Sequence, residues 1–192
     1  MDATRAFVKK ILIRAENFDW SLQGFGMLRL HMDDGFRLNV WDSRYRVKNV
    51  SMVHTHPWNF ESLVVCGRLV NWRYHESGTG YGKPYRFATI KPGPGGGLLD
   101  TRGEEVWLTN HGEVITAGVA YRQSADEIHL SAPEDGTVTL NKRQRVGEDV
   151  ARVYWPANTE WVSAEPRPAT ITEISTITNV ALARLLEEEV KG

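Results

Sequence analysis

Apolar and polar residues alternate with period two through most of the middle of the chain. In residues 28–32 and again in residues 36–40 every second residue is apolar, and Asp34-Gly35 between them supplies a tight turn. Because the side chains of a strand point alternately to its two faces, this pattern predicts a hairpin. Further segments of this kind follow, at residues 62–74, 85–90, 106–109, 114–122, 127–131, 137–143 and 150–155. Many short strands with turn residues between them indicate a β-sandwich or barrel.

The two ends of the chain have helical periodicity instead. Residues 3–15 place apolar side chains on one face, which predicts a short amphipathic helix with Asp2 as its cap. Residues 175–190 predict a second helix, and its acidic last turn, Glu187–Glu189, opposes the helix dipole and should fray. We therefore expect a single domain, 1–192, made of an N-terminal helical extension (1–22), a β-barrel (24–155) and a C-terminal tail and helix (156–192).

The composition is that of a globular protein and argues against several functions. The chain has 192 residues, of which 41% are hydrophobic and 24% charged, and its net charge of −1 offers no attraction to nucleic acid or an anionic membrane. The first twenty residues include Lys9, Lys10, Arg14 and Glu16, unlike a signal peptide or a membrane span. The single cysteine, Cys66, excludes an intramolecular disulfide and fits a reducing compartment, so we expect a cytoplasmic location.

Three histidines carry the candidate chemistry. His54 and His56 are one residue apart in an extended segment, so their rings share one face of a strand. His129 lies in another predicted strand, which a barrel can bring next to the first. Three protein ligands that leave positions open for water and substrate are typical of a catalytic metal site. We predict that His54, His56 and His129 hold one divalent metal ion.

These residues resemble the motifs of the cupin superfamily of small jelly-roll barrels. His54, His56 and Gly67 match the first motif, H-x-H followed by a glutamate and a glycine, and Gly118 and His129 match the second. The resemblance covers about residues 44–143 and implies an all-β fold: a cupin-type double-stranded β-helix (jelly-roll) barrel with short N-terminal and C-terminal helices. The chain departs from the two motifs at Lys48, Ser124, Asp126 and Pro133.

The glutamate of the first motif has two possible counterparts. The usual family spacing, counted back from Gly67, falls on Phe60, whereas the longer spacing from His56 falls on Glu61. If Phe60 faces the site, strand alternation turns Glu61 away from it. A site of three histidines without the carboxylate resembles the three-histidine non-haem iron cupins, among them thiol dioxygenases, which use ferrous iron and dioxygen. The resemblance implies Fe(II), and zinc, nickel, copper or manganese also suit such ligands.

A second carboxylate, Glu127, lies two residues before His129 and would share its face on a strand. It could be a metal ligand, an acceptor for an imidazole N–H or a general base; the alternative is a solvent-facing glutamate. Glu127 and Glu61 are therefore our candidate catalytic residues. We expect a partly apolar pocket beside the histidines, lined by Met52, Trp58, Phe60 and Tyr121. We place the other histidines at the surface: His31, His75, and His111 in a turn at residues 110–112.

The sequence leaves three functions open. The first is a mononuclear metal-dependent dioxygenase that acts on a small organic substrate. The second is a non-catalytic cupin that binds a small ligand, and the third is a metal-independent sugar isomerase or epimerase with a histidine as base. For each we expect a small-molecule partner and neither nucleic acid nor membrane. The analogy with cupins also implies a homodimer built from the terminal segments.

Overall fold

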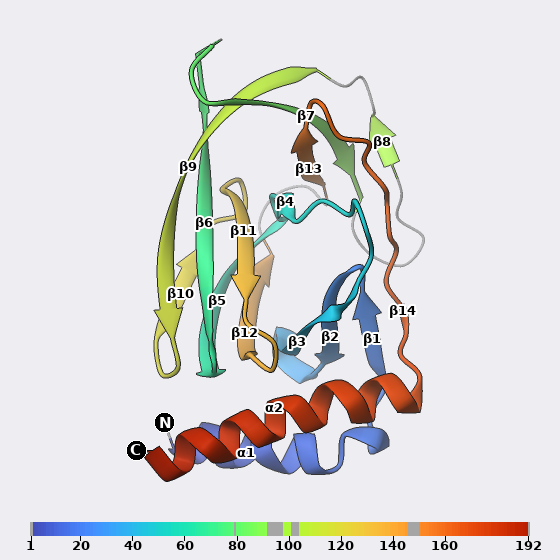
Figure 1. Cartoon of the computed structure of the whole chain (residues 1–192), viewed down its shortest axis with the longest axis vertical. Helices are drawn as coiled ribbons and strands as arrows, with labels where there is room; N and C mark the ends of the chain where they lie inside the picture. The colour runs from blue at the N-terminus through green and yellow to red at the C-terminus, as the bar shows by residue number, and fades with distance from the viewer. Residues whose placement is uncertain (1, 79, 92–97, 101–103, 146–149, 192) are drawn as a thin grey trace.

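A computed structural model of the chain describes residues 2–78, 80–91, 98–100, 104–145 and 150–191 (Figure 1). Strands occupy the middle of the sequence and an α-helix lies near each end. In chain order the elements are α1 (Asp2–Ile13), η1 (Ala15–Asn17), β1 (Trp20–Gln23), β2 (Phe25–His31), η2 (Asp33–Gly35), β3 (Phe36–Arg46), β4 (Val53–His54), β5 (Trp58–Cys66), β6 (Arg68–Ser77), β7 (Lys83–Ile90), β8 (Leu98–Asp100), β9 (Glu105–Thr116), β10 (Ala120–Gln123), β11 (Ile128–Pro133), β12 (Val138–Arg145), β13 (Ala151–Pro156), β14 (Arg167–Pro168) and α2 (Ile171–Lys191).

The strands form two antiparallel sheets. The first sheet has the order β10-β5-β12-β3-β2-β1-β14, and the second has the order β13-β4-β11-β6-β9-β7-β8. An additional pairing between β13 and β7 closes six strands of the second sheet into a barrel. Neighbours in the sheets are often distant in sequence, as in a jelly roll. The predicted fold class is confirmed: the chain is an all-β jelly-roll barrel with a helix at each terminus.

The largest apolar core lies between the first sheet and the two helices. Figure 1 shows α1 and α2 side by side beneath the strands. Alternate residues of the sheet, such as Leu28, Leu38 and Val138, are fully buried in this core together with Ile177 and Leu185 of α2. Because side chains alternate, the residues between these apolar positions point to the opposite, inner face of the first sheet, towards the second sheet. That inner face carries polar side chains.

Helix α2 begins at Ile171, earlier than we predicted, because a capping box starts it. The Thr170 hydroxyl accepts a hydrogen bond from the Glu173 N–H at 3.3 Å, and the Glu173 carboxylate accepts one from the Thr170 N–H at 2.8 Å. Arg167 also donates to this carboxylate, at 2.9 Å. The helix therefore starts in a reciprocal pair of hydrogen bonds supported by an ion pair.

The expected fraying of the last turn of α2 is wrong, because the helix continues to Lys191. Helix α1 supplies the cations that its acidic end requires. Arg5 pairs with Glu188 at 2.9 Å, and Lys9 pairs with Glu189 at 2.6 Å. These charges offset the unfavourable interaction between the glutamates and the helix dipole.

The predicted turn at residues 110–112 is also wrong. Strand β9 runs through it without a break and pairs with β6 along its length. Gly112 serves close packing here, since a Cβ at this position would lie 2.9 Å from the Trp72 ring. His111 is exposed, and its ring stacks on exposed His75 with the centroids 5.3 Å apart. His31 is exposed as well, as predicted.

No helix in the described part of the chain combines the length and the apolar character that crossing a bilayer requires.

The capping box gives a pH-dependent prediction. The hydrogen bonds from Arg167 and from the Thr170 N–H lower the pKa of Glu173 to about 2. A depressed carboxyl pKa stabilises the fold above the unfolded-state pKa of about 4.3, and this contribution is lost as the pH falls towards 2. We expect Glu173→Gln to destabilise the protein by roughly 0.5–1 kcal/mol at pH 7. Urea unfolding should show the difference shrinking between pH 5 and pH 2; a constant difference would contradict the ionic contribution.

Candidate metal centre

The three predicted histidines converge in the structure. His54 in β4 lies directly opposite His129 in β11 in the register of the two strands. His56 follows β4, where its backbone N–H donates to the Ala125 carbonyl at 2.9 Å. The candidate ligand nitrogens of the three rings all lie within 4.8 Å of one another. Residues more than seventy positions apart thus form one cluster on the face of the second sheet that meets the first sheet.

Hydrogen bonds fix the proton positions on two of the rings. Nδ1 of His54 lies 2.7 Å from the Met52 carbonyl oxygen, to which it can only donate. Nδ1 of His129 lies 3.1 Å from Oδ1 of Asn71. The Asn71 amide nitrogen donates to Oε1 of Gln123 at 3.2 Å, which orients the amide so that its oxygen faces His129. Both histidines therefore carry the proton on Nδ1 and leave the Nε2 lone pair for a ligand.

The nitrogens of His56 and His129 meet as two ligands of one ion would. Their Nε2 atoms are 3.0 Å apart. Because Nε2 of His129 is an acceptor, either the proton of His56 or a cation must lie between the two nitrogens. Two nitrogens each bound at about 2.1 Å to one ion, with roughly perpendicular bonds, are separated by about this distance. The donor set fits a divalent metal ion.

Burial keeps the three rings neutral. It is the main cause that lowers the pKa of His54, and it lowers the pKa of His56 and of His129 well below the usual value. The neighbouring rings act in the same direction, since charge on His54 would repel charge on the other two. Neutral imidazole is the form that binds a metal, so no proton has to be removed first at neutral pH.

A small pocket of about 60 Å³ adjoins the histidines. The four residues predicted to line it, Met52, Trp58, Phe60 and Tyr121, all belong to its wall. Met52 packs with Met27, Trp41 and Phe25 into an apolar cluster on one side. The remaining wall comes from the polar inner face of the first sheet, with Arg29, Arg37, Asn39, Thr139, Asn141 and Arg143.

A larger cavity of about 640 Å³ lies elsewhere in the second sheet. It is lined by Ile128, the strand neighbour of His129, and by none of the three clustered histidines. Strand alternation turns Ile128 and His129 to opposite faces of β11. We therefore assign the candidate chemistry to the smaller pocket, because only that one contains the imidazoles.

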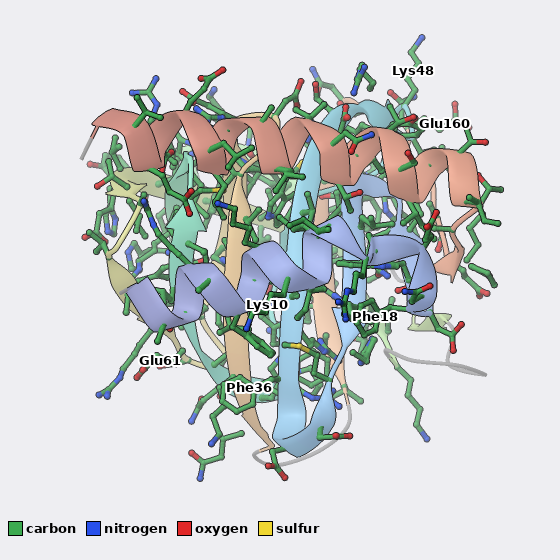
Figure 2. All side chains as sticks on the ribbon, turned by 90° about the horizontal axis from the view of Figure 1, so that it is seen from below. Lys10, Phe18, Phe36, Lys48, Glu61 and Glu160 are labelled. Carbon is green, nitrogen blue, oxygen red and sulfur yellow. The ribbon has the colours of Figure 1, made fainter. Side chains whose placement is uncertain are left out.

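The structure places both predicted carboxylates outside the cluster. Glu61 is exposed and pairs with Arg122 at 2.9 Å, and Figure 2 shows it at the edge of the molecule. Phe60 faces the site instead, with its ring centroid 5.2 Å from that of His56. Glu127 precedes β11 and therefore does not share a strand face with His129. Its carboxylate lies 3.4 Å from Nε of Arg73 and accepts the Ser124 N–H at 3.4 Å.

Sequence reasoning missed three residues of the site. Asn71 orients His129, while Arg29 and Arg37 form part of the pocket wall. The available signal was a polar residue between apolar neighbours in a strand, such as Asn71 after Val70. Asn71 is fully buried, and a buried amide in a strand requires hydrogen-bond partners on its own face.

Neither a protein-family model nor a curated protein matches this chain. The resemblance to cupins is carried by the jelly-roll barrel and the histidine cluster. Three nitrogen donors on one face of a pocket could bind one metal ion and leave positions open towards the pocket. The geometry does not by itself select the metal.

The support of His129 by Asn71 predicts a matched pair of variants. Asn71→Ala removes the acceptor that holds the Nδ1 proton, so we expect metal affinity to fall about 10- to 100-fold. Asn141→Ala truncates another asparagine of the pocket wall, one that bonds Asn39 and Ser62 and no histidine, and should leave the affinity within about threefold. Competition with a chromogenic chelator measures both. An equal loss in the two variants would refute the positioning role of Asn71.

Proposed function

We propose that this protein is a cupin-type metalloprotein in which His54, His56 and His129 hold one divalent metal ion, with Fe(II) as the first candidate. We further propose that it acts as a mononuclear oxygenase on a small organic substrate. The observation that carries the proposal is the 3.0 Å approach of two imidazole nitrogens within a three-histidine cluster that lines a pocket, with His129 buried and the other two histidines half-buried. Zinc, nickel, copper or manganese would suit the same ligands.

A bound ferrous ion supplies a redox-active centre with open positions for dioxygen and substrate. Residues around the three histidines would hold the imidazole rings ready to bind such an ion. Asn71 and the Met52 carbonyl hold two rings in the tautomer that binds. Trp58 stacks on His56 with the centroids 5.5 Å apart, and the Phe60 ring lies perpendicular to that of His56 with the centroids 5.2 Å apart. These aromatic rings restrict the motion of His56 and limit the access of water to it.

Phe60 also affects the charge of the site. It lies beside the histidines where the first cupin motif has a carboxylate, so the protein supplies three neutral ligands. The positive charge of the metal would then be balanced only by groups that bind in the pocket. On this proposal the site favours ligands that bring negative charge with them.

Metal content tests the first part of the proposal. We expect protein purified without a metal-affinity tag to hold about one metal ion per chain after loading with Fe(II) under anaerobic conditions. His54→Ala and His56→Ala should each lower the affinity at least about tenfold, because two nitrogens hold an open site poorly. His75→Ala, at an exposed histidine outside the cluster, is the control and should behave as wild type. Elemental analysis after gel filtration measures all four proteins, and a wild type without metal would refute the proposal.

Oxygen consumption tests the second part. The Fe(II)-loaded protein should consume dioxygen with at least one compound in a panel of small thiols and diols, and His56→Ala should abolish the consumption. An oxygen electrode measures the rate, with the chelator-treated protein as blank. Retained metal without oxygen consumption across the panel, but with thermal stabilisation by one of its compounds, would favour a non-catalytic ligand-binding protein instead.

A further inference from the structure

The side of the pocket that the first sheet forms is strongly cationic. Arg29 in β2 and Arg37 in β3 lie on adjacent strands and both line the pocket, together with Arg143 in β12. Arg37 is only 8% exposed. Burial, followed by repulsion from Arg29 and Arg143, lowers the pKa of Arg37 to about 8; burial and Arg143 lower the pKa of Arg29 to about 10. The charges on this wall therefore destabilise one another.

Neither arginine has a carboxylate partner among the residues that the structure describes. Arginines elsewhere pair with acids, as Arg44 does with Asp42 at 2.5 Å and Arg5 does with Glu188 at 2.9 Å. Arg29 instead donates from Nε to Oδ1 of Asn39 at 3.1 Å. Buried cations without a counter-charge are costly, so their placement in a pocket points to a ligand that supplies the charge.

Two buried donors in the lining of this pocket have no hydrogen-bond partner within the described part of the chain. They are Nε of Arg37 and Nε1 of Trp41, and Trp41 is 9% exposed. The nearby amide oxygens are already engaged: Oδ1 of Asn39 accepts from Arg29, and Oδ1 of Asn141 accepts from Asn39 at 3.2 Å. Both unpartnered groups are N–H donors, so the missing partner is an acceptor.

We propose that Arg29 and Arg37, with the Trp41 N–H, bind an oxyanion, a carboxylate or a phosphate group that belongs to the substrate. The guanidinium fork matches the paired oxygens of such groups. The pocket of about 60 Å³ has the volume of roughly two water molecules, which suits a compact anionic group. The inference rests on the proposed function only in treating this anion as part of the molecule that reaches the histidines.

The test uses chelator-treated, metal-free protein, so that it does not depend on metal binding. Thermal unfolding is measured in sodium acetate, sodium phosphate and sodium chloride at equal ionic strength and pH. We expect acetate or phosphate at about ten times its dissociation constant to raise Tm by roughly 3 °C or more above chloride. Arg37→Met should weaken the anion affinity at least about tenfold, because it removes the charge and the unpartnered donor.

Two comparisons separate binding from structural support. Arg122→Met replaces an arginine that is 85% exposed and paired with Glu61, and it should keep the full anion response. In chloride, Arg37→Met should unfold at the same temperature as wild type or higher, since a buried cation without a partner is lost. Arg37 also packs over Trp58, with its guanidinium carbon 4.8 Å from the ring centroid. Lower stability of Arg37→Met with an unchanged anion response would assign Arg37 to this packing and overturn the proposal.

The anion that raises Tm identifies the kind of anionic group that the substrate carries. A response to acetate alone indicates a carboxylate substrate, a response to phosphate alone a phosphate ester, and a response to both an oxyanion site of broader specificity. No difference between the three salts in wild type would overturn the inference and leave the metal proposal untouched. Conversely, an anion response in a protein that retains no metal would support this inference while the proposed function fails.

Discussion

The packing of helices α1 and α2 against the first sheet is the interaction on which the other features depend. This packing buries one face of the sheet, with residues such as Leu38, Val138 and Ile177 excluded from solvent. The helices supply the apolar core for the outer face of the first sheet, so its inner face, which meets the second sheet at the pocket, is free to carry polar residues. A shift of register by one residue would exchange the two faces, and the helices therefore also fix where Arg29 and Arg37 point.

Two of the three histidines, His54 and His129, lie on paired strands, and His56 follows β4 in a segment whose backbone is hydrogen-bonded to its neighbours. His54 pairs with His129 on one side and with Val153 on the other, so the short strand β4 is held from both edges. The next residue, Thr55, donates its N–H to the Arg152 carbonyl at 2.9 Å and accepts the Arg152 N–H at the same distance. Sites on regular elements hold their groups more tightly than sites on loops. The imidazoles can therefore be in place before a metal or a substrate arrives.

The features that the sequence predicted are those with a local pattern. Period-two alternation located the strands, and the spacing of His54 and His56 placed both rings on one side of the chain. The errors arose where a distant residue decides the structure. Gly112 is a residue type that is common in turns, but here it is a glycine because the Trp72 ring leaves no room for a side chain. The acidic end of α2 looked unstable because Arg5, which stabilises it, lies at the other end of the sequence. Asn71 acquires its role only when β6 pairs with β11, and Arg37 only when the two sheets face each other across the pocket.

The combination of neutral imidazoles and of arginines without carboxylate partners among the described residues gives the pocket a consistent electrostatic character. A carboxylate at the position of Phe60 would partly neutralise a bound metal and could also attract the arginines. With Phe60 there, the charge of a metal bound as proposed and the charge of the arginines would both be balanced by what enters the pocket. Arg37 is buried and Arg29 half-buried, with no carboxylate partner in the described part of the chain, and the apolar contacts between the helices and the first sheet offset the cost to folding stability. When a residue lowers folding stability and no local contact compensates for it, function rather than folding explains why that residue is there. The arginines and the histidines line the same pocket, which is the arrangement that the proposed metal and anion sites require.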